Sequence, residues 1–193
     1  MQRSDILHAA AQIFRQKGYH AASMQDIADA VQLQKASLYH HIDSKQDILL
    51  AILDMALDLL IDDLQQVVAS DYSPEEKIKR AMSVYIERLT EDADLAAVLL
   101  LEYRSLEPEL RAQHIERRDK YENLWRGLIR DGVSAKVFRP VDDAIATFAL
   151  LGVQNWTITW FREDGRMTAH QLADQFCNLF LNGLREPDRI ETQ

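Results

Sequence analysis

The chain has 193 residues, 47% of them hydrophobic and 27% charged, which is the composition of an ordinary globular protein with one substantial domain or two small ones. Its 31 acidic and 22 basic side chains give a net charge of −9, which argues against a protein that coats nucleic acid non-specifically. Only 6 glycines and 4 prolines are present, too few for the many turns of an all-β fold. The sequence therefore favours an all-α protein.

About nine helices are predicted from the spacing of apolar residues and from helix start and stop signals. Ser-x-x-Asp sequences begin at Ser23 and Ser44, and Ser73 precedes a proline and two acidic residues, all typical of helix starts. Gly18 and the pair Asp131-Gly132 predict helix ends. The predicted helices cover about residues 4–17, 24–31, 35–42, 44–69, 74–89, 94–105, 108–130, 141–161 and 168–184, and a polar tail follows from Glu186.

Charge is distributed unevenly along the chain. Residues 1–48 hold 5 basic and 5 acidic side chains and 4 of the 6 histidines, so the other 145 residues carry the whole net charge of −9. A neutral N-terminal segment need not repel DNA. We expect a small N-terminal module, residues 1–45, joined through the long fourth helix to a larger helical body, residues 46–193.

Residues 24–42 fit a helix-turn-helix, in which two short helices are joined by a turn of three residues. A recognition helix carries side chains in its first turn that reach base edges, with hydrogen-bond donors nearby for phosphates. The predicted base-facing residues are Lys35, Ser37 and His40, and the predicted contacts to the DNA backbone are Tyr39, His41 and Lys45. Lys45 also lies in the first turn of the fourth helix, where free N–H groups favour phosphate.

Two longer segments resemble the DNA-binding domain of the TetR family of bacterial transcriptional regulators. They are AAAQIFRQKGYHAASMQDIADAV, residues 9–31, and KASLYHHIDSK, residues 35–45, which a long aliphatic helix follows. The resemblance implies a three-helix DNA-binding domain, a connecting helix and a helical ligand-binding body that dimerises. By position it implies DNA contacts at Gln25, Lys35, Ala36, Ser37, Tyr39, His40, His41 and Lys45.

The chain departs from the family pattern at three positions. Gln32 replaces the usual turn glycine, Gln34 replaces a frequent serine, and Ile42 replaces a frequent phenylalanine. Gln32 is expected to be strained if the turn requires a left-handed residue. Gln34 is expected to cap the recognition helix less well than serine.

The C-terminal body is rich in aromatic side chains, which suits an apolar ligand pocket with a few placed polar groups. Residues 99–129 and 155–165 resemble the subgroup of TetR regulators that respond to acyl-coenzyme A thioesters. The resemblance implies an apolar tunnel for the acyl chain, with arginines at its mouth for the phosphates. The candidate ligand residues are Tyr103, Arg104, His114, Arg118, Tyr121, Trp125, Asn155 and Trp156, and an ordinary place in the core is the alternative for each.

The last two helices are expected to pair with their copies across a two-fold axis, as a four-helix bundle. They carry bulky and small residues at helical spacing, with burial inside the subunit as the alternative. The candidate interface residues are Phe148, Leu151, Gly152, Leu172, Phe176, Leu179 and Phe180.

Other kinds of site are disfavoured. The adjacent His40 and His41 point about 100° apart on a helix and do not chelate one metal ion together. The chain has no Gly-x-Ser-x-Gly motif and no phosphate-binding glycine loop, and Cys177, in the apolar run QFCNLF, is expected in the core. We therefore expect no enzyme activity, no cofactor and no metal.

The sequence and the resemblance together predict a ligand-responsive DNA-binding repressor. We expect a cytoplasmic homodimer on a pseudo-palindromic operator, released by a small apolar or acyl-CoA-type effector, with no membrane partner. The start of the chain lacks a signal-peptide pattern, and the apolar residues 144–161 are interrupted by polar ones. Two alternatives stay open, namely an all-helical enzyme and an apolar-ligand carrier with a non-functional helix-turn-helix.

Overall fold

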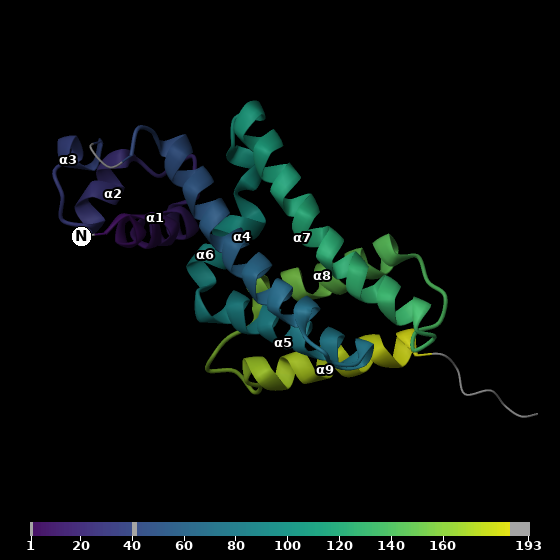
Figure 1. Cartoon of the computed structure of the whole chain (residues 1–193). Helices are drawn as coiled ribbons and strands as arrows, with labels where there is room; N and C mark the ends of the chain where they lie inside the picture. The colour runs from purple at the N-terminus through teal and green to yellow at the C-terminus, as the bar shows by residue number, and fades with distance from the viewer. Residues whose placement is uncertain (1, 40–41, 186–193) are drawn as a thin grey trace, which may run out of the picture. The chain divides into compact units, whose positions relative to one another are not determined.

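The computed structural model describes residues 2–39 and 42–185, and this part of the chain is all-α, as predicted (Figure 1). The predicted contacts His40 and His41 lie outside the described residues. The described helices are α1 (Arg3–Lys17), α2 (Met24–Ala30), α3 (Lys35–Tyr39), α4 (Lys45–Ala69), α5 (Pro74–Glu91), α6 (Ala93–Leu101), the 3-10 turn η1 (Tyr103–Ser105), α7 (Pro108–Ser134), α8 (Asp143–Trp160) and α9 (Ala169–Leu184).

Serine caps begin three of these helices where the sequence predicts them. The Ser23 hydroxyl accepts a hydrogen bond from the backbone N–H of Asp26 at 3.1 Å, and the Asp26 carboxylate accepts one from the backbone of Ser23, which completes a capping box. The hydroxyls of Ser44 and Ser73 accept bonds from backbone N–H groups three residues on, at 3.0 and 3.3 Å. Each cap satisfies an N–H group that has no partner inside its helix.

The predicted end of α7 at Arg130 is wrong, because the helix continues through Gly132 to Ser134. A Cβ atom on Gly132 would lie 2.1 Å from the ring of Phe138, which is buried. The chain turns back just after the helix, where the carbonyl of Gly132 accepts hydrogen bonds from the N–H groups of Val137 and Phe138. Gly132 therefore makes room for a side chain and does not stop the helix.

The chain divides into two compact units, each built from two stretches of sequence. Unit 1 contains residues 1–59 and 91–119, and unit 2 contains residues 60–90 and 120–193. The boundaries fall inside α4 and α7, so each of these long helices contributes to both units (Figure 1). The predicted boundary after residue 45 stays a prediction. We describe each unit by itself.

Unit 1 is held by a small apolar core beneath the N-terminal helices. Ile6, Phe14, Ile27 and Leu38 are fully buried, and the ring of Phe14 packs edge-on against that of Tyr19 with 5.2 Å between ring centres. Leu38 is the buried side chain of α3, so its insertion fixes which face of this short helix is exposed.

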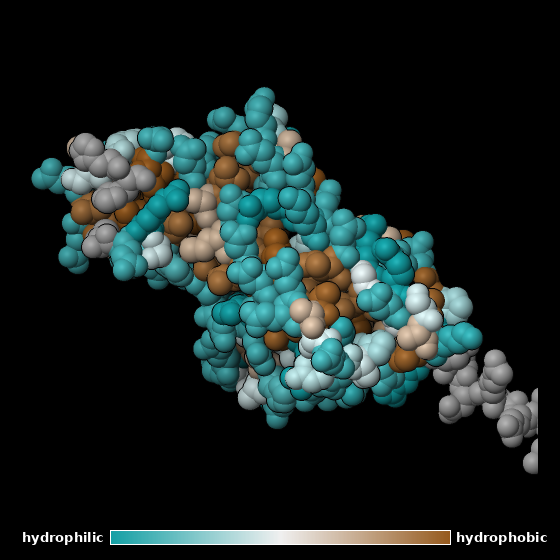
Figure 2. Space-filling view, in the orientation of Figure 1, coloured by the Kyte–Doolittle hydropathy of each residue, from teal (hydrophilic) through white to brown (hydrophobic). Residues whose placement is uncertain are grey.

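Unit 2 contains an aromatic cluster of Tyr85, Tyr121 and Trp125, whose ring centres are 6.1 to 6.4 Å apart. A second cluster packs Leu172 of α9 against Ile86 of α5. The solvent-facing residues are largely hydrophilic on the face shown in Figure 2, where apolar residues surface in separate patches.

Candidate functional site

The turn between α2 and α3 contains the left-handed residue that the family pattern made us consider at Gln32. Gln32 has a φ of 55°, in the left-handed region, and the N–H of Leu33 donates to the carbonyl of Ala28 at 2.9 Å. A side chain in this region costs about 1 kcal/mol relative to glycine. The turn thus requires a left-handed residue, and Gln32 meets the requirement with strain.

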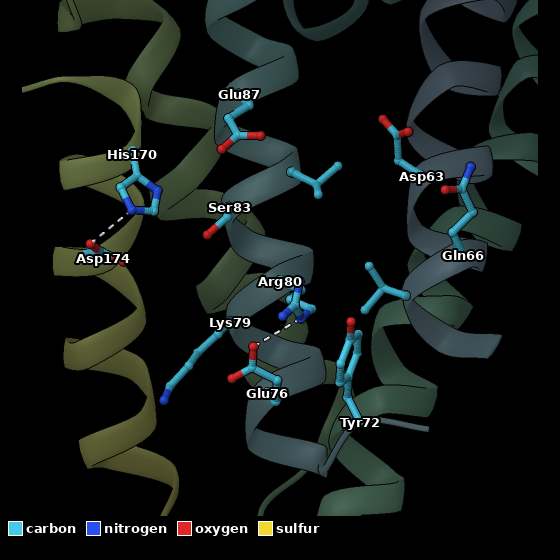
Figure 3. A pocket seen from close by; sticks show the side chains of 12 residues that line it. Asp63, Gln66, Tyr72, Glu76, Lys79, Arg80, Ser83, Glu87, His170 and Asp174 are labelled. Atoms are coloured by element: carbon cyan, nitrogen blue, oxygen red, sulfur yellow. Dashed lines mark ion pairs between the residues drawn. The ribbon is translucent and has the colours of Figure 1, made fainter. Parts of the chain in front are cut away.

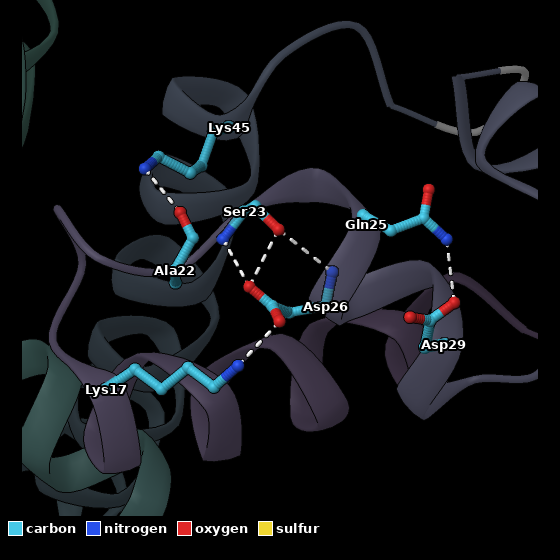
Figure 4. Close-up of polar contacts among 7 residues, drawn as sticks. All are labelled: Lys17, Ala22, Ser23, Gln25, Asp26, Asp29 and Lys45. Carbon is cyan, nitrogen blue, oxygen red and sulfur yellow. Dashed lines mark hydrogen bonds and ion pairs between the residues drawn. The ribbon is translucent and has the colours of Figure 1, made fainter.

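The first turn of α3 presents an open polar surface. Lys35 and Ala36 are exposed, Ser37 is half-buried, and Tyr39 is 44% exposed, which argues against a purely structural role for Tyr39. Among the described residues, neither Lys35 nor Tyr39 has a side-chain hydrogen bond or ion pair. Gln25, in the first turn of α2, is exposed and donates to Asp29 at 2.7 Å (Figure 4).

An acidic residue near this surface is neutralised by its neighbours. The Lys17 ammonium donates to the Asp26 carboxylate, which also accepts hydrogen bonds from the hydroxyl and backbone N–H of Ser23 (Figure 4). These donors, Lys17 first, hold the pKa of Asp26 well below its ordinary value. Asp26 is therefore an ionised helix cap whose charge is compensated, and it opposes DNA less than a free carboxylate.

Lys45 is placed at the start of α4, but its ammonium is engaged within the protein. Its Nζ donates to the backbone carbonyls of Ala22 at 2.7 Å and Tyr19 at 2.9 Å, with a third contact to the carbonyl of His20 at 3.5 Å. The same atom lies 4.5 Å from the centre of the Tyr19 ring. The sequence motif did not indicate this arrangement, which differs from the predicted phosphate contact.

The predicted ligand residues fall into two groups, one in each unit. In unit 1, Tyr103 lies beside two arginines: Arg104 donates to its hydroxyl at 3.1 Å, and the Arg118 guanidinium is 4.8 Å from its ring centre. The hydrogen bond from Arg104 is the main reason that the pKa of Tyr103 is lowered. His114 completes the group, with its ring centre 6.3 Å from that of Tyr103.

His114 is fully buried, and neither ring nitrogen has a hydrogen-bond partner among the described residues. Burial, reinforced by the charges of Arg118 and Arg117, lowers the pKa of His114 to about 4. The imidazole is therefore neutral near pH 7, with one donor and one acceptor to offer. Arg117, the residue before Arg118, is paired with Asp54 and Asp58 of α4.

In unit 2, Tyr121 and Trp125 are buried in the aromatic cluster, and the hydroxyl of Tyr85 donates to the amide oxygen of Asn155. Trp156 of α8 differs from the other candidates in unit 2, because it is 66% exposed. The prediction that Trp156 lines an internal ligand site is therefore not supported by its position. Aromatic content alone did not distinguish an inward from an outward residue on this helix.

The outer faces of α8 and α9 expose apolar side chains. Leu179 is 71% exposed, Phe148 is 53% exposed, and Gly152 is also exposed, while Leu151, Phe176 and Phe180 are half-buried. A groove of about 410 Å³ between the two helices is lined mainly by apolar residues, among them Ile145, Ala149, Leu179 and Phe180. Leu172 departs from the prediction: it is 2% exposed and packs on Ile86, so it has almost no surface to offer a partner.

Comparisons with known proteins decide the family. The sequence of residues 6–52 matches the family "Bacterial regulatory proteins, tetR family", and residues 71–184 match "Tetracyclin repressor-like, C-terminal domain". The chain belongs to the TetR family. The resemblance inferred from the N-terminal motifs is thereby confirmed, despite the departures at Gln32, Gln34 and Ile42.

Full-length relatives of this TetR-family chain are regulators. The HTH-type transcriptional repressor KstR2 of Rhodococcus jostii is 29% identical, over 96% of this chain and 92% of its own. The crystal structure of the TetR-family regulator PfmR from Thermus thermophilus is 40% identical, with a TM-score of 0.86 over 94% of this chain and 99% of its own. AibR, crystallised with isovaleryl coenzyme A and operator DNA, is 32% identical, with a TM-score of 0.85 over 92% of this chain and 96% of its own.

The sequence reasoning missed a buried polar stripe on α8 of this TetR-family chain. Thr147, Leu150, Gln154 and Thr157 recur at helical spacing and are the buried residues of the helix. Thr147 Oγ1, Gln154 Oε1 and Thr157 Oγ1 have no hydrogen-bond partner among the described residues. The helical spacing of these residues is visible in the sequence, but the sequence alone does not show that this face of the helix is buried.

A second cleft, of about 550 Å³, lies between the end of α4, α5 and α9 (Figure 3). Two contacts between charged or titratable side chains lie within its lining: Arg80 binds Glu76 at 3.0 Å and covers the ring of Tyr72, and His170 lies 3.6 Å from Asp174. None of the predicted ligand residues lines it. We assign no function to this charged cleft.

Three further features of the described residues bear on metal binding, membrane insertion and thiol chemistry. No group of three or more metal-binding side chains occurs there, and no helix has the length and apolarity to cross a membrane. Cys177 is buried, as expected, and burial raises the pKa of its thiol to about 11. It is therefore a protonated core residue near pH 7.

Proposed function

We propose that this TetR-family protein is a transcriptional repressor that binds DNA as a homodimer in the cytoplasm, has no enzyme activity, and is released by a small effector. The observation that carries the proposal is α3 itself. Leu38 anchors the helix, while Lys35, Ala36 and Tyr39 stand exposed in the position of a recognition helix. Gln25 and Ser37, which the structure also describes, are further proposed DNA contacts. His40 and His41 are proposed as DNA contacts from the family pattern alone.

A homodimer would place two α3 helices on one side of DNA, which requires a pseudo-palindromic operator with half-sites about 34–36 Å apart. The proposed interface is the exposed apolar face of α8 and α9, with Phe148, Gly152 and Leu179 at its surface. Trp156 and Ile145, which are 66% and 65% exposed, join this face. Exposed apolar side chains in such number mark a protein–protein contact.

An acyl-CoA thioester is the effector class that we propose. The relative AibR was crystallised with isovaleryl coenzyme A, and here the half-buried Tyr103, the buried His114 and the exposed Arg118 supply aromatic surface, a neutral imidazole and a cation. Asn155 and the aromatic cluster around Trp125 are the corresponding candidates in unit 2. The effector would release DNA by preferring a conformation that binds the operator poorly.

Binding of the purified protein to the DNA upstream of its own gene tests the proposal, measured by fluorescence anisotropy over a range of salt concentrations. We expect specific binding, with an association constant whose logarithm falls linearly with the logarithm of the salt concentration. Lys35→Ala should weaken binding and relax preference at one base pair by about 1–3 kcal/mol, whereas Lys120→Ala, at an exposed position on α7, should change neither.

Absent or salt-insensitive DNA binding would contradict the repressor function. In that case, tight binding of an acyl-CoA thioester without turnover would point to a ligand carrier, and turnover would point to an enzyme. A thermal-shift screen of acyl-CoA thioesters of varied chain length addresses the effector separately, because a ligand that binds the folded state raises the melting temperature.

A further inference from the structure

Two adjacent residues in the first turn of α4, Lys45 and Gln46, bind two different segments of unit 1. Lys45 binds the loop between α1 and α2, and Gln46 binds the connection between α6 and α7. Both segments are distant in sequence from α4, and all these contacts lie within the same compact unit. The junction they form is not required by a helix-turn-helix motif as such.

The contacts of Lys45 use the donors that a phosphate contact would need. A lysine ammonium has three N–H groups. The carbonyl oxygens of Ala22, Tyr19 and His20 lie 2.7, 2.9 and 3.5 Å from Nζ. The same ammonium group lies over the face of the Tyr19 ring. These carbonyls belong to the loop between α1 and α2, which leads into Ser23, the capping serine of α2, as Figure 4 shows for Ala22 and Ser23.

The contacts of Gln46 use both ends of its amide. Its Nε2 donates to the carbonyl of Ser105 at 3.0 Å, and its Oε1 accepts from the N–H of Glu107 at 3.0 Å. A side chain held at both ends by backbone groups has one orientation, and it fixes the distance between the segments that it joins.

Glu102, at the end of α6, joins the α1–α2 loop to the α6–α7 connection. The Glu102 carboxylate accepts a hydrogen bond from the backbone N–H of Tyr19 at 3.2 Å and another from the hydroxyl of Ser105 at 3.1 Å. The loop at Tyr19 is thus bound to α4 through Lys45 and to the α6–α7 connection through Glu102, while Gln46 joins α4 to that connection. Three segments are each tied to the other two.

We propose that Lys45 and Gln46 are positioning residues for DNA recognition, which hold the loop that leads into α2 and α3, and that Lys45 makes no phosphate contact. The inference rests on the proposed DNA-binding function. It replaces the phosphate role that the sequence suggested for Lys45, because a lysine that turned toward DNA would leave three backbone carbonyls without their donor.

The salt dependence of DNA binding separates positioning from phosphate contact. Each lost phosphate contact reduces the slope of log affinity against log salt concentration by about 0.9, so a homodimer that loses one contact per subunit loses about 1.8, whereas a lost positioning contact lowers affinity by one factor at every salt concentration. The variants are Lys45→Met, which keeps the aliphatic stem, and Gln46→Leu, which changes no charge. Lys120→Met is the control for the loss of one positive charge at an exposed site outside unit 1.

We expect both Lys45→Met and Gln46→Leu to bind the upstream DNA at least several-fold more weakly with the wild-type slope, and to melt at a lower temperature. Lys120→Met should match the wild type in all three respects. A slope for Lys45→Met that falls by about 1.8, because the dimer would lose one phosphate contact in each subunit, with an unchanged melting temperature would overturn the positioning role and leave the repressor function standing. If Lys45→Met does not fold, wild-type affinity of Gln46→Leu overturns the proposal. Failure of the wild type to bind any DNA removes the proposed function and the positioning role together.

Discussion

Acidification should destabilise the protein through His114, whose buried ring takes up a proton only in the unfolded chain. The pKa of His114 is lowered from 6.5 to about 4 in the folded state, by burial first and then by Arg118 and Arg117. The unfolded chain therefore binds more protons between these two values, and stability falls as the pH falls through this window. From about pH 7.5 to about pH 5 the expected loss from this one residue is about 2 kcal/mol.

Urea unfolding at the two pH values, followed by circular dichroism and tryptophan fluorescence, measures the effect. Other groups titrate in the same range, so the test is the difference between the wild type and His114→Leu, which carries no titrating ring. The variant should lose about 2 kcal/mol less on acidification. His170→Leu is the matched control, because the His170 side chain is 71% exposed. An equal pH dependence of the wild type and His114→Leu would refute the reasoning that a neutral imidazole is locked in unit 1.

Three further predictions test single features of the fold. Gly132→Ala should destabilise by about 1–3 kcal/mol, because the added Cβ meets the ring of Phe138, whereas Gly127→Ala, with open space at its Cβ, should stabilise slightly; thermal unfolding compares them. Gln32→Gly should raise the free energy of unfolding by about 0.5–1 kcal/mol by relieving the left-handed residue, and an unchanged value would mean that the turn is not strained. Leu179→Asp should weaken self-association at least about 30-fold, and a dimer that persists in light scattering at low concentration would exclude the α8–α9 face.

The local features of the fold were predictable from the sequence. The serine caps at Ser23 and Ser44 depend on residues only three positions apart, so the sequence displays them directly. The left-handed turn at Gln32 was also foreseen, because the family pattern has glycine there. Such signals carry their physical cause within one turn of helix.

Features that depend on distant contacts were not predictable. Gly132 looked like a helix stop, and only the return of Phe138 onto α7 reveals its role. Leu172 and Leu179 have the same apolar character on α9, yet one packs on Ile86 and the other faces outward. A hydrophobic pattern predicts that a side chain is shielded from water, but it does not indicate which neighbouring residue packs against that side chain.

The division of the chain into units built from discontinuous stretches bears on how such regulators can be recombined. The N-terminal helices are tied to residues after position 90: Arg15 pairs with Asp94 at 2.9 Å, and His8 lies 3.3 Å from Asp92. A graft that moved only residues 1–45 onto another body would sever these pairs and strip Tyr19 of its bond to Glu102. A chimaeric regulator with the DNA specificity of this protein should therefore include α6 and the start of α7 together with the N-terminal helices α1 to α3.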